Sequence, residues 1–179
     1  MDAAPSSWVN INIASSSRDS VNEILPGQLW LGNGSAASES ALLQSLGIHK
    51  ILNVADDVPN FLESEGKFEY FNLSVADFGA DRGISRTFDI AFEKLKEWEN
   101  SDFRVFVHCA AGMNRSATIV IAWLMYSRGL QLSEAWRIVR EKRKVCPQKD
   151  NRLELIKYEK LLFNDKSSYD NEDDFVYGR

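Results

Sequence analysis

The segment from Val105 to Val120 constrains the fold of this chain more than any other part of it. An apolar strand predicted at Arg104–Val107 leads through a short loop into a helix predicted at Ser116–Arg128, which Gly129 ends. The strand is apolar enough to be central and covered on both faces, as strands of parallel sheets are. A strand followed closely by a helix is a building block of α/β domains, so this segment favours that class.

Short apolar runs alternate with longer segments of helical spacing along the rest of the chain. Further strands are predicted at Glu23–Leu25, Gln28–Leu31, Lys50–Val54 and Phe68–Val75. Further helices are predicted at Ser38–Leu46, Ser85–Glu99, Ser133–Lys144 and Asp150–Phe163. We therefore expect one α/β domain over residues 21–163, with a central mixed, largely parallel sheet flanked by helices.

Polar segments flank this domain on both sides. Residues 1–20 are rich in Ser, Ala and Asn, and residues 164–179 carry a run of acidic side chains. Such segments bury too little apolar surface to offset the entropy of ordering them, so we predict two flexible tails. A segment for partner docking or phosphorylation is the alternative interpretation of the acidic one.

The loop before the predicted helix has the features of an anion site. The first turn of a helix has unpaired backbone N–H groups and lies at the positive end of the helix dipole. Gly112 allows the loop to curl tightly around a bound anion. Arg115 can offer two parallel donors to a phosphoryl group, which a lysine cannot. Phosphoryl oxygens are expected to bind Ala110, Ala111, Gly112, Met113, Asn114 and Arg115.

Cys109 is the candidate nucleophile of this loop. The helix dipole and the guanidinium of Arg115 favour thiolate over thiol, and a thiolate attacks readily at neutral pH. Ser116 is expected to donate a hydrogen bond to the sulfur and ease its departure from a covalent intermediate, with a plain N-cap as the alternative. His108 is expected to orient the loop by hydrogen bonding.

The remaining cysteine and histidine are expected to have no catalytic role. Cys146 is interpreted as a free thiol, with a protective disulfide to Cys109 as the alternative. His49 has no second ligand-type residue at a spacing suited to a metal. We therefore expect no metal site.

The pattern His108-Cys-x5-Arg-Ser after an apolar strand resembles the signature of the protein tyrosine phosphatase superfamily, in its dual-specificity branch. The resemblance extends over roughly residues 21–163. It implies an atypical, stand-alone member of that family, because the chain has no room for an amino-terminal kinase-docking domain. Further segments run in the family's order, namely Ile24–Gly32, Leu46–Val54, Ala117–Met125, Ala135–Arg143 and Pro147.

The family takes the proton for the leaving oxygen from an Asp in the loop after the strand that ends near Val75. Asp77 and Asp81 are both candidates. We favour Asp77 because it follows the strand directly, whereas Asp81 abuts Arg82 and is explained as a cap or a solvated charge. The loop is one residue longer than in many relatives, so Asp81 stays open as the alternative.

The resemblance implies hydrolysis of phosphotyrosine, and of phosphoserine and phosphothreonine in a shallow pocket, through a phosphocysteine on Cys109. Asp77 would serve as general acid and then as general base, and no cofactor is required. Phosphorylated proteins, protein kinases among them, are the expected partners. The motif Asn-Arg-Tyr, which phosphotyrosine-specific relatives use to recognise their substrate, has no match in the chain.

Three other functions stay open. RNA 5'-triphosphatase activity is one, because Asn114 precedes the loop arginine in capping-enzyme relatives too. A phosphoinositide or phosphoglycan phosphatase is the second, although the loop carries no lysine between Cys109 and Arg115. A non-catalytic phosphoprotein-binding module is the third.

The overall charge bears on the expected partners. A net charge of −5 argues against bulk attraction to nucleic acid or to anionic lipid. The chain has no apolar run long enough to span a bilayer, and its first residues do not resemble a secretory signal. We expect a monomer in the cytoplasm, with the nucleus as a second compartment.

Overall fold

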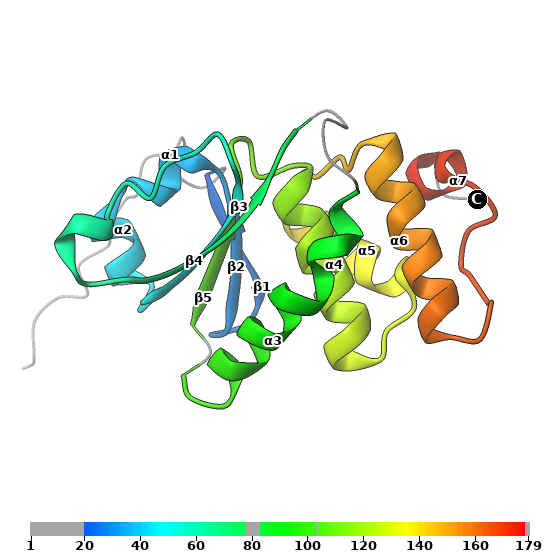
Figure 1. Cartoon of the computed structure of the whole chain (residues 1–179), viewed down its shortest axis with the longest axis horizontal. Helices are drawn as coiled ribbons and strands as arrows, with labels where there is room; N and C mark the ends of the chain where they lie inside the picture. Colours follow the sequence, from blue (N-terminus) through cyan, green and yellow to red (C-terminus); the bar gives the residue numbers. More distant parts are fainter. Residues whose placement is uncertain (1–19, 78–82, 103, 178–179) are drawn as a thin grey trace, which may run out of the picture.

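A five-stranded sheet forms the centre of the molecule, in a computed structural model that describes residues 20–77, 83–102 and 104–177 (Figure 1). The strand order is β1 (Val21–Leu25), β2 (Leu29–Gly32), β5 (Val105–His108), β3 (Lys50–Ala55) and β4 (Glu69–Val75). β1 and β2 are antiparallel, and all other neighbouring strands are parallel. The expected α/β fold with a mixed, largely parallel sheet is confirmed, and β5 is its central strand.

Helices cover both faces of the sheet (Figure 1). One face carries α1 (Gly34–Ala37) and α2 (Ser40–Ser45). The other carries α3 (Phe88–Glu99), α4 (Arg115–Arg128), α5 (Leu132–Lys142) and α6 (Lys149–Leu162). Two short 3-10 helices, η1 (Glu63–Glu65) and η2 (Ile84–Thr87), lie in the connections before β4 and α3.

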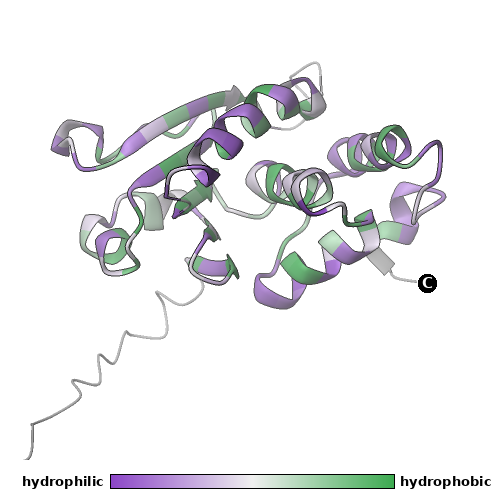
Figure 2. Cartoon of the chain, turned by 90° about the horizontal axis from the view of Figure 1, so that it is seen from below, coloured by the Kyte–Doolittle hydropathy of each residue, from purple (hydrophilic) through white to green (hydrophobic). Residues whose placement is uncertain are grey.

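The sheet separates two hydrophobic cores. The side chains of β5 alternate between them, because Phe106 packs with the core under α1 and α2 while Val105 and Val107 join the larger core under α3 to α6. Every side chain of α4 from Arg115 to Met125 is buried, since this helix lies between the sheet and the other helices. Those outer helices carry purple and green residues side by side in Figure 2, as amphipathic helices do.

Two segments differ from expectation. The helix predicted at Ser38–Leu46 is present as the shorter α2, but the preceding helix α1 was not predicted; the Ser38 hydroxyl donates to the carbonyl of Ser35 at 2.8 Å at the end of α1. The acidic segment expected as a flexible tail folds back and forms α7 (Glu172–Tyr177). Phe175 anchors it: this ring is fully buried, with its centroid 4.7 Å from that of Trp136.

Ionic contacts also hold α7 against α6. Lys149 Nζ lies 2.7 Å from a carboxylate oxygen of Glu172, and Arg152 Nε donates to the Glu172 carbonyl at 2.9 Å. Composition alone missed this docking, because one buried aromatic residue outweighs the polar character of its neighbours. None of the helices within the described ranges has the length and apolar character needed to cross a bilayer.

Candidate active site

The loop over residues 109–114 connects the end of β5 to the start of α4. Its tight path depends on Gly112, which has a φ of 67° and passes so close to the Gly32 carbonyl that a Cβ would collide with it. The central strand therefore ends where a helix begins, at the carboxyl edge of the parallel sheet. This edge is where α/β folds place their ligands.

Four consecutive loop carbonyls accept hydrogen bonds from outside the loop. Gly34 N donates to the Ala110 carbonyl at 2.9 Å, and Cys146 N donates to the Met113 carbonyl at 2.9 Å. Arg143, only 7% exposed, donates to the carbonyls of Ala111 and Gly112 at 3.2 and 2.8 Å. Because the N–H of a trans peptide points opposite to its C=O, carbonyls that face outward leave the following N–H groups facing inward. The loop is thus a preformed cradle for an anion.

Cys109 is buried at the base of this cradle, with an exposure of 2%. Its Sγ accepts hydrogen bonds from Gly112 N at 3.3 Å and from Ser116 Oγ at 3.1 Å. The predicted hydrogen bond from Ser116 to the Cys109 sulfur is present in the structure.

Arg115 is 1% exposed and reaches back across the strand ends. Its Nη1 donates to Asp57 Oδ1 at 2.7 Å and to the Val75 carbonyl at 3.0 Å, and it lies 3.5 Å from Asp56 Oδ1. Its Nε is buried without a partner among the described residues. A buried donor left unpaired is costly, so this N–H is suited to donate to a bound acceptor.

The surroundings of Arg115 keep it charged. Burial alone lowers the pKa of Arg115, but the hydrogen bond to Asp57 and the charges of Cys109 and Asp77 raise that pKa above its ordinary value. The same hydrogen bond lowers the pKa of Asp57. The guanidinium is therefore a permanent cation, oriented by carboxylates on one side.

Asp77 follows β4 and lies beside the loop. Its Oδ2 is 3.4 Å from Arg115 Nη2, and its Oδ1 accepts a hydrogen bond from Asn114 Nδ2 at 3.0 Å. Its side chain keeps 28% of its surface exposed, so solvent reaches it. Asp81, the alternative acid, lies outside the described residues.

His108 is fully buried beside Cys109. Its ring stacks on Phe106 with centroids 5.4 Å apart, and burial lowers its pKa to about 4 although the backbone of Cys109 opposes this shift. Neither ring nitrogen has a hydrogen-bond partner of ordinary geometry in the described part of the chain. The ring is therefore neutral at physiological pH, and its loop-orienting role stays a prediction.

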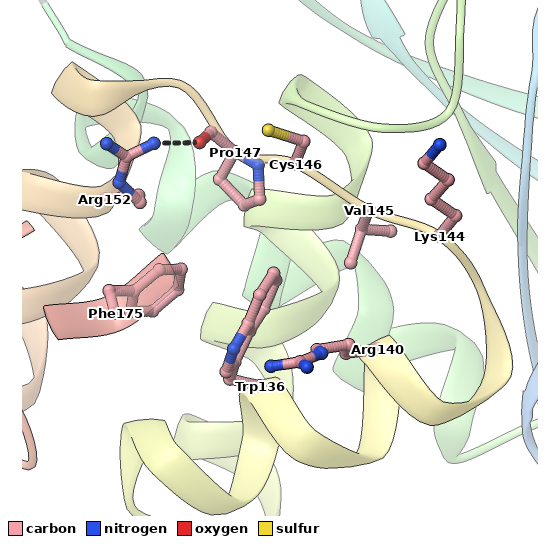
Figure 3. Close-up of a pocket in the computed structure, with 8 residues that line it drawn as sticks. All are labelled: Trp136, Arg140, Lys144, Val145, Cys146, Pro147, Arg152 and Phe175. Carbon is pink, nitrogen blue, oxygen red and sulfur yellow. Dashed lines mark hydrogen bonds between the residues drawn. The ribbon is translucent and has the colours of Figure 1, made fainter. Parts of the chain in front are cut away.

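Cys146 and Arg152 border a pocket beside the loop (Figure 3). The pocket has a volume of about 360 Å³. Val145, Pro147 and the rings of Trp136 and Phe175 give it apolar walls, and Arg140 and Lys144 add positive charge (Figure 3). Cys146 is an exposed free thiol. Its backbone N–H donates to the Met113 carbonyl of the loop.

Sequence reasoning missed four residues of this site. Asp56 and Asp57 follow β3, the parallel neighbour of β5, so the rule that carboxyl ends of parallel strands meet at one edge could have found them. Arg143 and Asn151 come from the end of α5 and from α6. No local pattern marks those two residues, because their contacts depend on how the helices pack.

A match to a protein-family model identifies the family of this chain. The model for the catalytic domain of dual specificity phosphatases matches residues 29–161. The chain belongs to this family.

Sequence comparison with known proteins leads to the same family. The chain is 34% identical over 142 residues to dual specificity protein phosphatase Mpk3 of Drosophila melanogaster, a match that covers 78% of the chain and 34% of that protein. It is 41% identical over 123 residues to dual specificity protein phosphatase 1-A of Xenopus laevis, covering 69% and 32%. The chain thus spans about a third of the length of these relatives.

Two human crystal structures illustrate the shared fold. Human DUSP28 superposes with a TM-score of 0.72 at 25% identity, covering 79% of this chain and 94% of that one. The human tyrosine phosphatase-like serine/threonine/tyrosine-interacting protein gives a TM-score of 0.71 at 32% identity, covering 80% and 97%. The dual-specificity phosphatase domain described here therefore has the fold expected from its signature.

Proposed function

We propose that this protein hydrolyses phosphate monoesters on proteins, phosphotyrosine first and phosphoserine and phosphothreonine more slowly, through a phosphocysteine on Cys109. The observation that carries the proposal is the anion cradle, in which inward N–H groups and the unpaired Nε of Arg115 surround a buried thiol. Phosphorylated proteins, among them protein kinases, are the proposed substrates, in line with the names of the curated relatives.

In the first step Cys109 Sγ attacks phosphorus, so that an S–P bond forms as the P–O bond to the substrate breaks. Asp77 gives its proton to the leaving oxygen. Charge builds up on the phosphoryl oxygens, and Arg115 with the loop N–H groups stabilises it. The bonds from Arg115 Nη1 to Asp57 and Val75 support this role because they hold the guanidinium in place before substrate arrives.

In the second step water attacks phosphorus and the S–P bond breaks, leaving the thiolate and inorganic phosphate. Asp77, now ionised, takes a proton from the attacking water. The hydroxyl of Ser116, 3.1 Å from the sulfur, stabilises the thiolate as it leaves. These two steps restore every group to its starting state.

Turnover of four substrates tests the proposal: a phosphotyrosyl peptide, a phosphothreonyl peptide, a phosphoinositide and triphosphate-ended RNA. We expect the highest kcat/KM for phosphotyrosyl peptide, and activity that EDTA leaves intact. Release of the γ-phosphate from RNA or of phosphate from the lipid, without peptide hydrolysis, would reassign the substrate. Lack of turnover on all four, with phosphopeptide binding retained, would favour a binding module.

The variant Cys109→Ser tests the covalent mechanism. It should lose turnover but still bind inorganic phosphate, because the loop N–H groups and Arg115 remain while the serine hydroxyl is a poor nucleophile. Cys146→Ser is the matched control, since that thiol is exposed and the substitution keeps the backbone N–H that donates to the loop. Substantial hydrolysis by Cys109→Ser would refute a phosphocysteine.

A further inference from the structure

Asn114, the last residue of the loop, makes three side-chain hydrogen bonds that the phosphate cradle itself does not need. Its Nδ2 donates to Asp77 Oδ1 at 3.0 Å. Its Oδ1 accepts from the backbone N–H of Gln148 and from Nδ2 of Asn151, both at 2.8 Å. The side chain thus bridges the acidic residue after β4 and the first turn of α6.

These partners fix which way the amide of Asn114 faces. An amide has one accepting and one donating end, and only the correct end can satisfy each partner. Turning the amide over would set its NH2 group against two donors, Gln148 N and Asn151 Nδ2, and its oxygen against a carboxylate. The donating end must therefore face Asp77.

We propose that Asn114 is a positioning residue that holds Asp77 in place for proton transfer, with α6 as its rigid support. This inference rests on the proposed role of Asp77 as general acid and base. The two oxygens of Asp77 are held separately, Oδ1 by Asn114 and Oδ2 by Arg115. These two contacts fix the position and the orientation of the Asp77 carboxyl group relative to the loop.

Asn151 connects this arrangement to α6. It lies in the first turn of that helix and donates to Asn114 Oδ1, so the side chain of Asn114 alone links Asn151 to Asp77. A positioned acid works only when its geometry is held closely, and a displacement of 1 Å can cost roughly 100-fold in rate. The first turn of α6 therefore helps to set the efficiency of a proton transfer that it does not touch.

The test compares kcat for a phosphotyrosyl peptide with kcat for para-nitrophenyl phosphate, whose leaving group needs little protonation. In Asn114→Ala the ratio of the two values should fall by roughly 10-fold to 100-fold. Asn151→Ala, outside the loop, should shift the ratio in the same direction by less. Asn114→Asp keeps both accepted hydrogen bonds but cannot donate to Asp77, so its ratio should fall as well.

A double-mutant cycle separates positioning from damage to the loop. In an Asp77→Ala background, Asn114→Ala should change the ratio no further, because the group it positions is gone. The inhibition constant of inorganic phosphate reports separately on the cradle, and Asn151→Ala, which lies in α6 outside the loop, should retain it.

Equal losses on both substrates in Asn114→Ala would overturn the positioning role while leaving the proposed function intact, provided that Asp77→Ala alone lowers the ratio. Absence of any leaving-group dependence in Asp77→Ala would overturn the role of Asp77 as the acid, and with it the positioning role of Asn114.

Discussion

The buried His108 beside Cys109 makes the stability of the fold depend on pH. Burial lowers the pKa of His108 from 6.5 to about 4. Between these values the unfolded chain binds a proton that the folded protein excludes, so protons favour unfolding. Stability is therefore complete above about pH 6.5 and falls as the pH drops toward 4.

The size of the effect follows from the two pKa values of His108. At pH 5 the His108 ring is almost fully protonated in the unfolded state but not in the folded state, which lowers the free energy of unfolding by about 2 kcal/mol. Below pH 4 this loss levels off at about 3 kcal/mol. No discount for solvent screening applies, because the ring is fully buried. The total free energy of unfolding of a protein is usually about 5 to 15 kcal/mol, so this loss is a large fraction of it.

Urea unfolding of the wild type and of His108→Asn at pH 7, 6 and 5 measures this loss of stability. The wild type should lose about 2 kcal/mol more than the variant between pH 7 and pH 5. His49→Asn, which replaces the other, exposed histidine, is the matched control. Parallel losses in the wild type and in His108→Asn would refute the argument. Should His108→Asn not fold, NMR titration of the His108 ring would decide, and a protonated ring at pH 6 would contradict the prediction.

Three more outcomes follow from the geometry. Asp77→Ala should lower kcat for a phosphopeptide by about 10² to 10⁴ and much less for para-nitrophenyl phosphate; a larger, leaving-group-dependent loss in Asp81→Ala would reassign the acid. Arg143→Met should cost about 1 to 3 kcal/mol in urea unfolding, because it leaves loop carbonyls unpaired, and should weaken phosphate binding, whereas the exposed Arg140→Met should do neither. Phe175→Ala should cost at most about 3 to 5 kcal/mol, and hydrogen exchange should speed up in α7 first; faster exchange throughout the domain would show that α7 is part of the global core.

Local patterns were enough to predict most of the fold. The apolar run of β5 and the helix from Ser116 onward need no distant contact to be recognised, because periodicity and a terminal glycine mark them. Where the pattern was weak, neighbouring groups decided the outcome. The short helix α1 was not expected, and the buried ring of Phe175 holds an acidic segment, expected as a tail, in place as α7.

The sequence alone determined the chemistry of the cradle, because Cys109, Gly112 and Arg115 lie within one strand-loop-helix unit whose local geometry brings them together. Only the tertiary structure decided what holds these groups in place. Asp57 orients Arg115, and Asn151 lies behind Asn114, across separations of 58 and 37 residues. Contacts over such distances form only when strand ends and helices pack, since loop closure must be offset by burial elsewhere in the domain.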